Sequence, residues 1–150
     1  MAFIGNLLWF VFGGGFLSWL LWVLAGLLLA LTVVGLPFAK AAFRISVFAA
    51  FPFGHQLIDG RLLGYERIAG TGFVNVLWCV LAGVWLSVSH VLEGLACCTT
   101  LVGIPFGLAH FKLAQVAFAP LGKVIVPNEV AAAARRRAAQ DAVEQALGRG

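Results

Sequence analysis

GLPFAKAAFRISVFAAFPFG, residues 35–54, and GIPFGLAHFKLAQVAFAPLG, residues 103–122, align with each other without a gap. At an offset of 68 residues the alignment keeps glycine, proline and one basic position together, in the pairs Thr32/Thr100, Gly35/Gly103, Pro37/Pro105, Phe38/Phe106, Phe43/Phe111, Arg44/Lys112, Pro52/Pro120 and Gly54/Gly122. Chance similarity between two apolar segments would not preserve all of these residue types. The chain therefore contains an internal repeat.

The repeat extends upstream of these segments. An offset of 69 residues aligns four further positions, in the pairs Asn6/Asn75, Trp9/Trp78, Gly14/Gly83 and Ser18/Ser87. Each unit predicts a long apolar helix (about 6–33 and 74–101), a Gly-x-Pro break, a shorter helix (about 37–51 and 105–119) and a Pro-x-Gly exit. Proline in the first turn starts a helix well, and the glycine before it lets the backbone turn. The pattern predicts two tandem copies of a helical hairpin.

The composition indicates an integral membrane protein. Apolar residues make up 62% of the chain and charged residues 11%, against roughly 45–50% and about 25% in soluble domains. Residues 1–39 and 68–92 carry no Asp, Glu, Lys or Arg, and each run exceeds the roughly 20 residues that a helix needs to cross a bilayer. The first run has no basic segment before it, so we expect a retained helix and not a cleaved signal peptide. The predicted fold class is all-α, in the membrane.

The polar segments predict how the chain is divided. We expect a membrane domain over 1–127, with repeat 1 at about 4–58, a connecting loop at about 59–71 and repeat 2 at about 72–126, followed by a cytoplasmic helical tail at 128–150. In the loop, Asp59-Gly60 flanked by Gln-Leu-Ile and Arg-Leu-Leu predicts a small β-hairpin. In the tail, Asn128 is the predicted cap of an alanine-rich helix that ends at Gly148.

Two topologies fit this division. If the short helices also cross the bilayer, there are four crossings, and the basic residues of the loop, the second exit and the tail all lie on one side, as the positive-inside rule favours. If only the long helices cross, the two units are inverted relative to each other. We favour four crossings with both termini in the cytoplasm, although helices of about 15 residues are short for a full crossing and leave a re-entrant geometry open.

The basic residues of the short helices predict a site. Arg44 and Lys112 lie two turns after the Gly-x-Pro breaks, and Lys40 lies one turn from Arg44 on the same face. With the positive ends of the two helices they would attract a small anion, in a path formed by Arg44, Lys112, Lys40, Gly35, Pro37, Gly103 and Pro105. The alternative is that both short helices lie near the interface and their basic side chains reach the lipid headgroups.

Other intramembrane polar residues belong to the second unit alone. His90, Glu93 and His110 suggest a proton relay or a loose metal site. The first unit has no acid or histidine at the equivalent positions, so we favour a structural pair of Glu93 with Lys112 or with His90. No catalytic residues, enzymatic activity, cofactor or resident metal are expected.

Small and basic residues suggest contacts with other helices and with lipid. Gly14-x-x-x-Ser18 and Gly83-x-x-x-Ser87 have the spacing that lets membrane helices approach closely. Arg135, Arg136 and Arg137 of the tail would gain about 1 kcal/mol each from anionic headgroups, and a solvated helix is the alternative. We expect membrane lipid as a partner and no nucleic acid.

Several motifs resemble the YccF-domain family of small bacterial inner-membrane proteins. They are Asn6-Leu7-Leu8-Trp9 with its echo Asn75-Val76-Leu77-Trp78, then Gly103-Ile104-Pro105-Phe106-Gly107, His110-Phe111-Lys112 and Ala119-Pro120-Leu121-Gly122-Lys123. The resemblance covers about residues 4–127. It implies a multi-pass protein of the bacterial cytoplasmic membrane, and it implies no reaction or substrate.

These observations lead to two functional hypotheses. The first is a homo-oligomeric channel or transporter for a small inorganic ion, with an anion favoured, in which several copies supply the walls of the path. The second is a membrane accessory or scaffold protein that transports nothing and binds a partner membrane protein through its small-residue helix faces and its basic tail.

Overall fold

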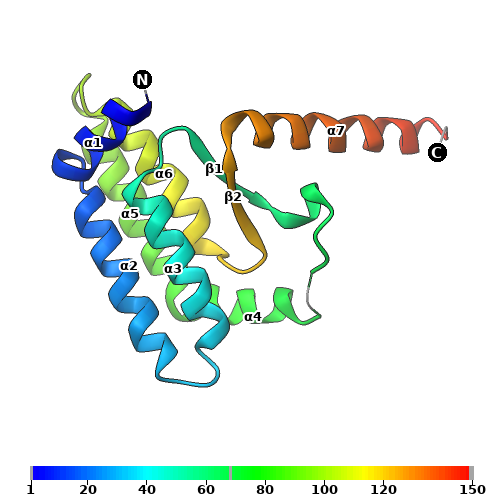
Figure 1. Ribbon diagram of the computed structural model, residues 1–150, viewed down its shortest axis with the longest axis horizontal. Helices are drawn as coiled ribbons and strands as arrows, with labels where there is room; N and C mark the ends of the chain where they lie inside the picture. Colours follow the sequence, from blue (N-terminus) through cyan, green and yellow to red (C-terminus); the bar gives the residue numbers. More distant parts are fainter. Residues whose placement is uncertain (1, 68, 149–150) are drawn as a thin grey trace.

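The computed structural model describes residues 2–67 and 69–148, and most of them are helical (Figure 1). The first half contains α1 (Ala2–Phe12), α2 (Gly15–Ala30), α3 (Leu36–Ala50), β1 (His55–Asp59) and a 3-10 turn (Gly60–Leu63). The second half contains α4 (Thr71–Trp78), a π-helical turn (Cys79–Gly83), α5 (Val84–Cys97), α6 (Ile104–Phe118), β2 (Lys123–Pro127) and α7 (Asn128–Ala146).

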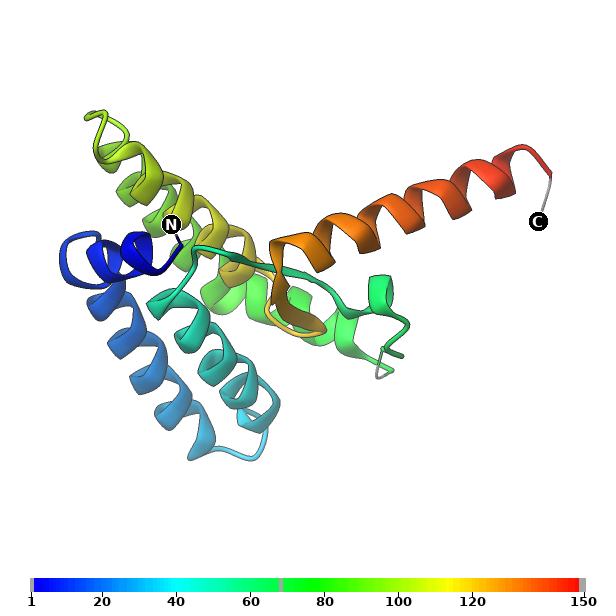
Figure 2. The same ribbon diagram turned by 45° about the horizontal axis from the view of Figure 1, so that its top comes forward.

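Each half contains a hairpin of two closely packed helices, α2 with α3 and α5 with α6. A Cβ on Gly26 would lie 2.8 Å from the ring of Phe43, and one on Gly94 would lie 2.6 Å from the ring of Phe111. Glycine at these positions therefore lets each ring lie directly on the facing helix. Figure 2 shows the two hairpins diverging from the central strands in different directions.

The first long helix differs from the prediction of one helix over about 6–33. The chain bends by 74° between α1 and α2, and Gly14 at the bend has a φ of 85°, which favours glycine. A Cβ on Gly13 or Gly15 would lie within 2.7 Å of the Trp9 side chain. The buried Trp9 ring thus occupies the space that a continuous helix with larger residues would need.

The second long helix is continuous from Thr71 to Cys97, through the π-helical turn. Within the described residues it is the one unbroken helix long and apolar enough to cross a bilayer, and the bent pair α1–α2 makes a second if it is counted as one crossing. The helices α3 and α6 have 15 residues each, or about 22 Å at 1.5 Å per residue, against roughly 30 Å of hydrocarbon. Four crossings therefore remain a prediction.

A two-stranded sheet joins the two halves. β1 pairs antiparallel with β2, and Leu57 faces Ile125 at the centre of the ladder. The prediction of a β-hairpin within the loop was wrong. The carboxylate of Asp59 accepts a hydrogen bond from the backbone N–H of Arg61 at 3.0 Å, which caps the 3-10 turn, so the chain after β1 does not return as a strand.

Buried side chains from both halves form one core. Its largest fully buried members are Trp9, Phe48, Ile45 and Leu113. A second, smaller cluster lies where α7 packs through Ala131 and Ala134 against the sheet. Beyond these contacts α7 extends away from the helices (Figures 1 and 2). The helix begins at Asn128 as predicted, but Pro127 and not Asn128 occupies the cap position.

Candidate functional site

Basic side chains of α3 line a cavity beside the sheet. Lys40 and Arg44 lie on the exposed face of α3 and border a space of about 480 Å³ together with Pro37, Arg67 and Lys123. We call this space the basic cavity. The sequence analysis identified Lys40, Arg44 and Pro37 as members of an anion site, and the fold adds Arg67 from the loop and Lys123 from the second exit.

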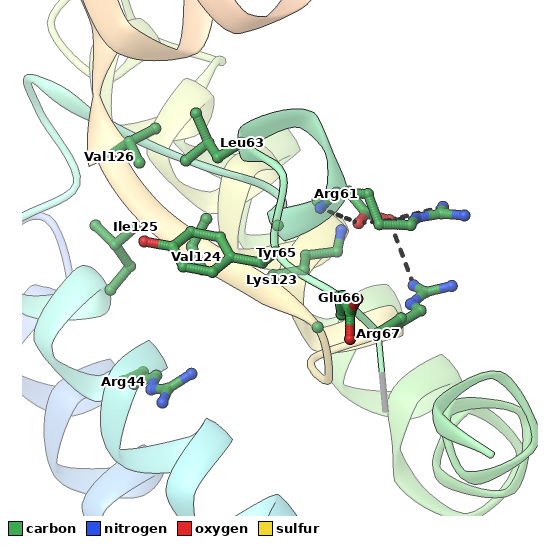
Figure 3. Close-up of a pocket in the computed structure, with 13 residues that line it drawn as sticks. Arg44, Arg61, Leu63, Tyr65, Glu66, Arg67, Lys123, Val124, Ile125 and Val126 are labelled. Atoms are coloured by element: carbon green, nitrogen blue, oxygen red, sulfur yellow. Dashed lines mark hydrogen bonds and ion pairs between the residues drawn. The ribbon is translucent and has the colours of Figure 1, made fainter. Parts of the chain in front are cut away.

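A second space of about 610 Å³ adjoins the basic cavity and shares Arg44, Arg67 and Lys123 with it (Figure 3). Two acidic residues, Asp59 and Glu66, line this space. Asp59 pairs with Arg61 at 2.9 Å and with Arg67 at 3.4 Å. Hydrogen bonds from Arg61 lower the pKa of Asp59 to about 2, so this carboxylate stays ionised and cancels part of the surrounding positive charge.

Three basic side chains of the cavities, Lys123, Arg44 and Lys40, differ in their contacts. Burial lowers the pKa of Lys123, and the Asp59 carboxylate opposes this effect. The Lys123 ammonium donates to the carbonyl oxygen of Gln115 at 3.3 Å. Arg44 and Lys40 have no ion pair with any described residue, so their charges face the cavity without an acidic partner.

Lys112 does not line the cavity that Arg44 borders. Its Nζ donates to the carbonyl oxygens of Pro52 and His55, each at 3.4 Å, at the exit of the first hairpin. Arg44 instead borders a space that is also lined by Gly122 and Lys123, at the exit of the second hairpin. Each basic residue of the predicted pair therefore faces the exit of the other half, and the two do not form one site.

At each Gly-x-Pro break the backbone N–H of the glycine forms a hydrogen bond with a neighbouring threonine. The backbone N–H of Gly35 donates to Thr32 Oγ1 at 3.0 Å, and that of Gly103 donates to Thr100 Oγ1 at 3.0 Å. These amides are thus satisfied within the hairpin tips. Pro105 begins α6 as Pro37 begins α3, but the cavity-lining residues include Pro37 and not Pro105.

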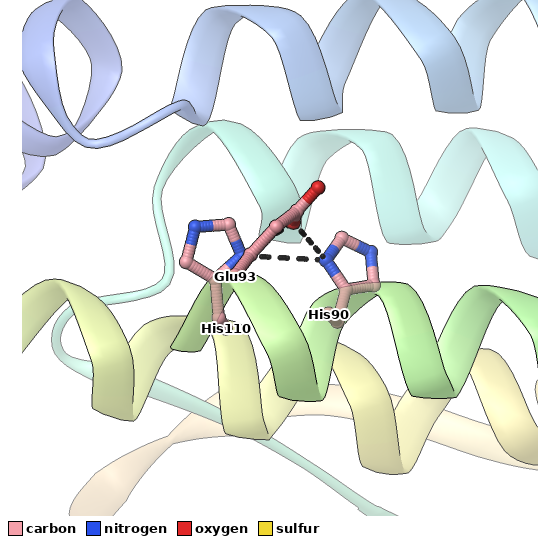
Figure 4. Close-up of side chains that lie close together, drawn as sticks. All are labelled: His90, Glu93 and His110. Carbon is pink, nitrogen blue, oxygen red and sulfur yellow. Dashed lines mark hydrogen bonds and ion pairs between the residues drawn. The ribbon is translucent and has the colours of Figure 1, made fainter. Parts of the chain in front are cut away.

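The predicted polar residues of the second half form a tight cluster (Figure 4). Glu93 Oε2 lies 3.1 Å from His90 Nδ1 and 3.0 Å from His110 Nδ1, and the two Nδ1 atoms are 3.3 Å apart. Both histidines are buried, whereas the Glu93 side chain is 52% exposed. Of the two pairs proposed for Glu93, the pair with His90 is present, while Lys112 forms its contacts elsewhere.

The cluster also contacts the first half. The ring of His110 lies 4.8 Å from that of Trp9, centroid to centroid. Its Nε2 edge faces the bend after α1, where the backbone of Gly13 is a hydrogen-bond partner of the ring and a Cβ on Gly14 would lie 3.7 Å from Nε2. His110 is therefore held between its own hairpin and the α1–α2 bend.

The predicted packing positions have different environments in the two halves. Gly14 lies in the bend and not on a helix face. A Cβ on Gly83 would lie 2.9 Å from the carbonyl oxygen of Phe118, and Ser87 donates to the carbonyl oxygen of Ala114 at 2.9 Å. These two residues thus contact α6 within the same chain.

The three arginines of the tail that were predicted to bind lipid headgroups are exposed, namely Arg135, Arg136 and Arg137.

Sequence reasoning missed the loop contribution to the basic cavity. Arg67 and Lys123 are 56 positions apart in the chain and meet because β1 pairs with β2. The repeat carried a signal for this pairing, since both exits have the same Pro-x-Gly motif, and Gly54 and Gly122 have the same left-handed φ, 86° and 84°.

Apolar helices with exposed hydrocarbon side chains, joined to a small charged sheet and tail, define this chain as a helical membrane protein. The YccF family model, described as an inner membrane component domain, matches residues 4–55 and 73–123. The chain belongs to this family of inner-membrane proteins.

Named relatives agree with this assignment. The inner membrane proteins YccF of Escherichia coli (strain K12) and of Shigella flexneri are each 35% identical to this chain over 140 residues, which cover 90% of this chain and 94% of the relative. No solved structure matches the chain.

Proposed function

We propose that this membrane protein is a homo-oligomeric channel or transporter for a small inorganic anion, and that the basic cavity is its cytoplasmic entrance. The observation that carries the proposal is the set of basic side chains around that cavity. Lys40, Arg44, Arg67 and Lys123 border it, against one acidic residue, Glu66. A cavity with an excess of one charge sign concentrates ions of the opposite sign and raises their rate of entry.

The size of the chain and its exposed surface support the proposal of an oligomer. The two hairpins diverge, and side chains such as Leu28, Val47 and Leu81 are more than half exposed. A single copy does not surround a path with four helices of this length. Further copies packed against these faces would supply the remaining walls, as cyclic symmetry allows.

We further infer that the two halves are copies of one unit. Trp9 donates to the Ala49 carbonyl at 2.7 Å, and Trp78 donates to the Ala117 carbonyl at 2.8 Å. Asn6 exchanges hydrogen bonds with Phe53 as Asn75 does with Leu121. The partners in these contacts are offset by 68 or 69 residues, the same offsets at which the sequence repeats.

The ladder between the halves supports a two-fold relation. Leu57 faces Ile125, which is its equivalent at an offset of 68. The hydrogen bonds at the two ends of the ladder are also equivalent, because Gly60 donates to the Gly122 carbonyl at 2.9 Å and Asn128 donates to the Gly54 carbonyl at 3.0 Å. A strand that pairs with its own copy in this register has a local two-fold axis at its centre.

The same ladder favours both termini on the cytoplasmic side. An inverted arrangement of the halves would separate Arg61 and Arg67 from Lys123 by the membrane, whereas Asp59 faces Lys123 in the ladder. With the sheet on one side, the basic residues of the loop and the tail lie together, as the positive-inside rule favours for the cytoplasm. The hairpin tips contain exposed apolar residues such as Val33 and Val102, which suits contact with lipid.

Ion flux from reconstituted liposomes tests the proposal. We expect the wild-type protein to pass chloride in preference to potassium, and Arg44→Glu to lower the ratio of chloride to potassium permeability by about tenfold or more, because the charge at the entrance is reversed. Arg136→Glu, which reverses an exposed charge on the tail, serves as the matched control and should leave the ratio unchanged.

Two outcomes would contradict the proposal. The absence of flux for every anion and cation tested, from protein that is helical and oligomeric after reconstitution, would remove transport. An unchanged ion preference in both Arg44→Glu and Lys40→Glu would remove the basic cavity from the path.

The exposed tail supports a second function, that of an accessory protein for a partner membrane protein. Ala131 and Ala134 are the buried residues of α7, and most of the remaining helix is exposed and extends away from the core. We propose that this helix would then bind the partner. Truncation after Pro127 should abolish co-purification of the partner, and the wild-type protein should give no ion flux of its own.

A further inference from the structure

We propose that His90, Glu93 and His110 bind a divalent transition-metal ion of the Zn²⁺ class. The sequence analysis expected no resident metal, because the first unit has no acid or histidine at the equivalent positions. The fold brings a third ligand into place, since α6 adds His110 to the His90–Glu93 pair of α5. The inference does not rest on anion transport, because none of these residues borders the basic cavity.

The distances fit a tetrahedral ion. The three atoms His90 Nδ1, Glu93 Oε2 and His110 Nδ1 are separated by 3.1, 3.0 and 3.3 Å, so they form a nearly equilateral triangle. An ion with bonds of about 2.0–2.1 Å has tetrahedral edges of about 3.3 Å. An ion just outside the plane of this triangle would therefore lie within bonding distance of all three atoms, with one position left for water.

The ligand types select among metals. Two imidazole nitrogens and one carboxylate oxygen suit Zn²⁺, Fe²⁺, Co²⁺ and Ni²⁺, whereas Mg²⁺ and Ca²⁺ prefer sites made of oxygen atoms alone. The exposed side chain of Glu93 gives an ion access to the two buried histidines. The fourth coordination position would face the exposed side of the cluster, where Glu93 lies.

A bound ion would replace the hydrogen bonds that now join the three atoms. Each neutral imidazole has one N–H, and Glu93 Oε2 is the common acceptor for both Nδ1 atoms. Two N–H groups that donate to one oxygen lie side by side here, with their nitrogens 3.3 Å apart. A single cation at the centre of the triangle replaces both protons and accepts a lone pair from each atom.

Surrounding contacts hold the ligands in place. His90 and Glu93 lie one turn apart on α5, and α6 packs closely on α5 because a Cβ on Gly107 would lie 2.7 Å from the Gly94 carbonyl. The far edge of the His110 ring has the backbone of Gly13 as a partner, and Trp9 covers its face. A backbone partner on the far nitrogen is the usual support of a metal-bound histidine.

Metal titration of the purified protein tests the site. The full chain would be produced with a tag that contains no histidine, purified in detergent, stripped with EDTA and titrated with Co²⁺. We expect one Co²⁺ per chain with the intense visible absorption of a tetrahedral complex, and loss of this absorption when Zn²⁺ is added. His90→Gln, Glu93→Gln and His110→Gln should each weaken binding by about 100-fold or more, since each removes a ligand.

The third histidine of the chain provides the matched control. His55 is exposed and lies at the start of β1, outside the cluster, so His55→Gln should bind Co²⁺ as the wild type does. Glu93→Gln is the ligand variant whose result does not depend on refolding of the core, because the Glu93 side chain is half exposed. Absence of tetrahedral Co²⁺ in wild-type protein with full helicity would overturn the proposal, as would unchanged affinity in Glu93→Gln.

Discussion

In each half, one tryptophan near the start of the half forms a hydrogen bond with the end of the short helix. The indole N–H of Trp9 donates to Ala49 and that of Trp78 to Ala117, and both contacts are buried. We expect Trp9→Phe and Trp78→Phe each to lower the free energy of unfolding by about 1–3 kcal/mol, because a buried carbonyl loses its donor. Denaturant unfolding in detergent micelles, followed by circular dichroism, measures the change.

A third tryptophan controls for the loss of the indole itself. Trp85 is 69% exposed, and Trp85→Phe should change the free energy of unfolding by less than about 0.5 kcal/mol. Equal losses in all three variants would show that the two buried hydrogen bonds have no special weight.

The ionised Asp59 makes stability depend on pH in a narrow acidic range. Its pKa is lowered from 3.8 to about 2 in the folded protein, chiefly by the hydrogen bond from Arg61. The carboxylate therefore stabilises the fold fully above pH 3.8, and the contribution is lost as the pH falls toward 2. The difference in unfolding midpoint between wild type and Asp59→Asn should be constant from pH 5 to 7 and should shrink between pH 4 and 2.

The partner of this carboxylate gives the complementary variant. Arg61→Gln removes the main cause of the lowered pKa, so its difference from wild type should shrink over the same range of pH. A difference that stays constant down to pH 2 in both variants would exclude the Asp59–Arg61 pair as the cause.

At the scale of single elements, Gly107 is one of the glycines that allow the close contact between α5 and α6. A Cβ on Gly107 would lie 2.7 Å from the Gly94 carbonyl and against the sulfur of Cys98. We expect Gly107→Ala to lower the free energy of unfolding by about 1–3 kcal/mol, because the two helices must move apart. The same detergent unfolding assay measures this change.

Another helical glycine is the control for this substitution. A Cβ on Gly72 in α4 would meet nothing within 4 Å, so Gly72→Ala should be neutral or stabilising by up to about 1 kcal/mol. A loss of stability in Gly72→Ala equal to that in Gly107→Ala would show that backbone propensity, and not helix contact, sets the cost.

The elements differed in how well the sequence predicted them. Both short helices begin and end within one residue of the prediction, because the Gly-x-Pro and Pro-x-Gly motifs mark their ends locally. The break after α1 lies at the glycine run Gly13-Gly14-Gly15, which permits a kink, but its 74° bend also depends on where the Trp9 ring packs. The sheet was missed for the same reason, since the partner of Leu57 is Ile125 and not a neighbour in the loop.

At the scale of the whole molecule, the ladder predicts the side on which the polar segments lie. We expect reporter fusions after Gly64 and after Gly148 both to be cytoplasmic. Gly64 follows β1, Gly148 follows the helix that begins after β2, and the pairing of β1 with β2 places both strands on one side of the membrane. A fluorescent protein that folds only in the cytoplasm, paired with a phosphatase that is active only outside it, measures both. Opposite sides for the two fusions would contradict the arrangement.

The candidate sites were predicted in part. Lys40, Arg44 and Pro37 were identified because basic residues are rare within apolar helices, but Arg67 and Lys123 looked like ordinary loop charges until the ladder placed them beside Arg44. The expected link between Arg44 and Lys112 is absent, because each faces the exit of the other half. His90, Glu93 and His110 were identified together as polar residues of the second unit, but the contact of His110 with the other two depends on the packing of α6 on α5.

The self-matching register of the ladder has a consequence for shorter forms of the chain. Residues 55–59 pair with residues 123–127 in the register that they would adopt with a second copy of themselves, Leu57 opposite Leu57. A chain that ends after the first exit would therefore have an open strand whose complement is an identical strand on another molecule. We expect such a half-length protein to form a symmetric dimer through this strand, with its two copies arranged like the two halves of the present chain.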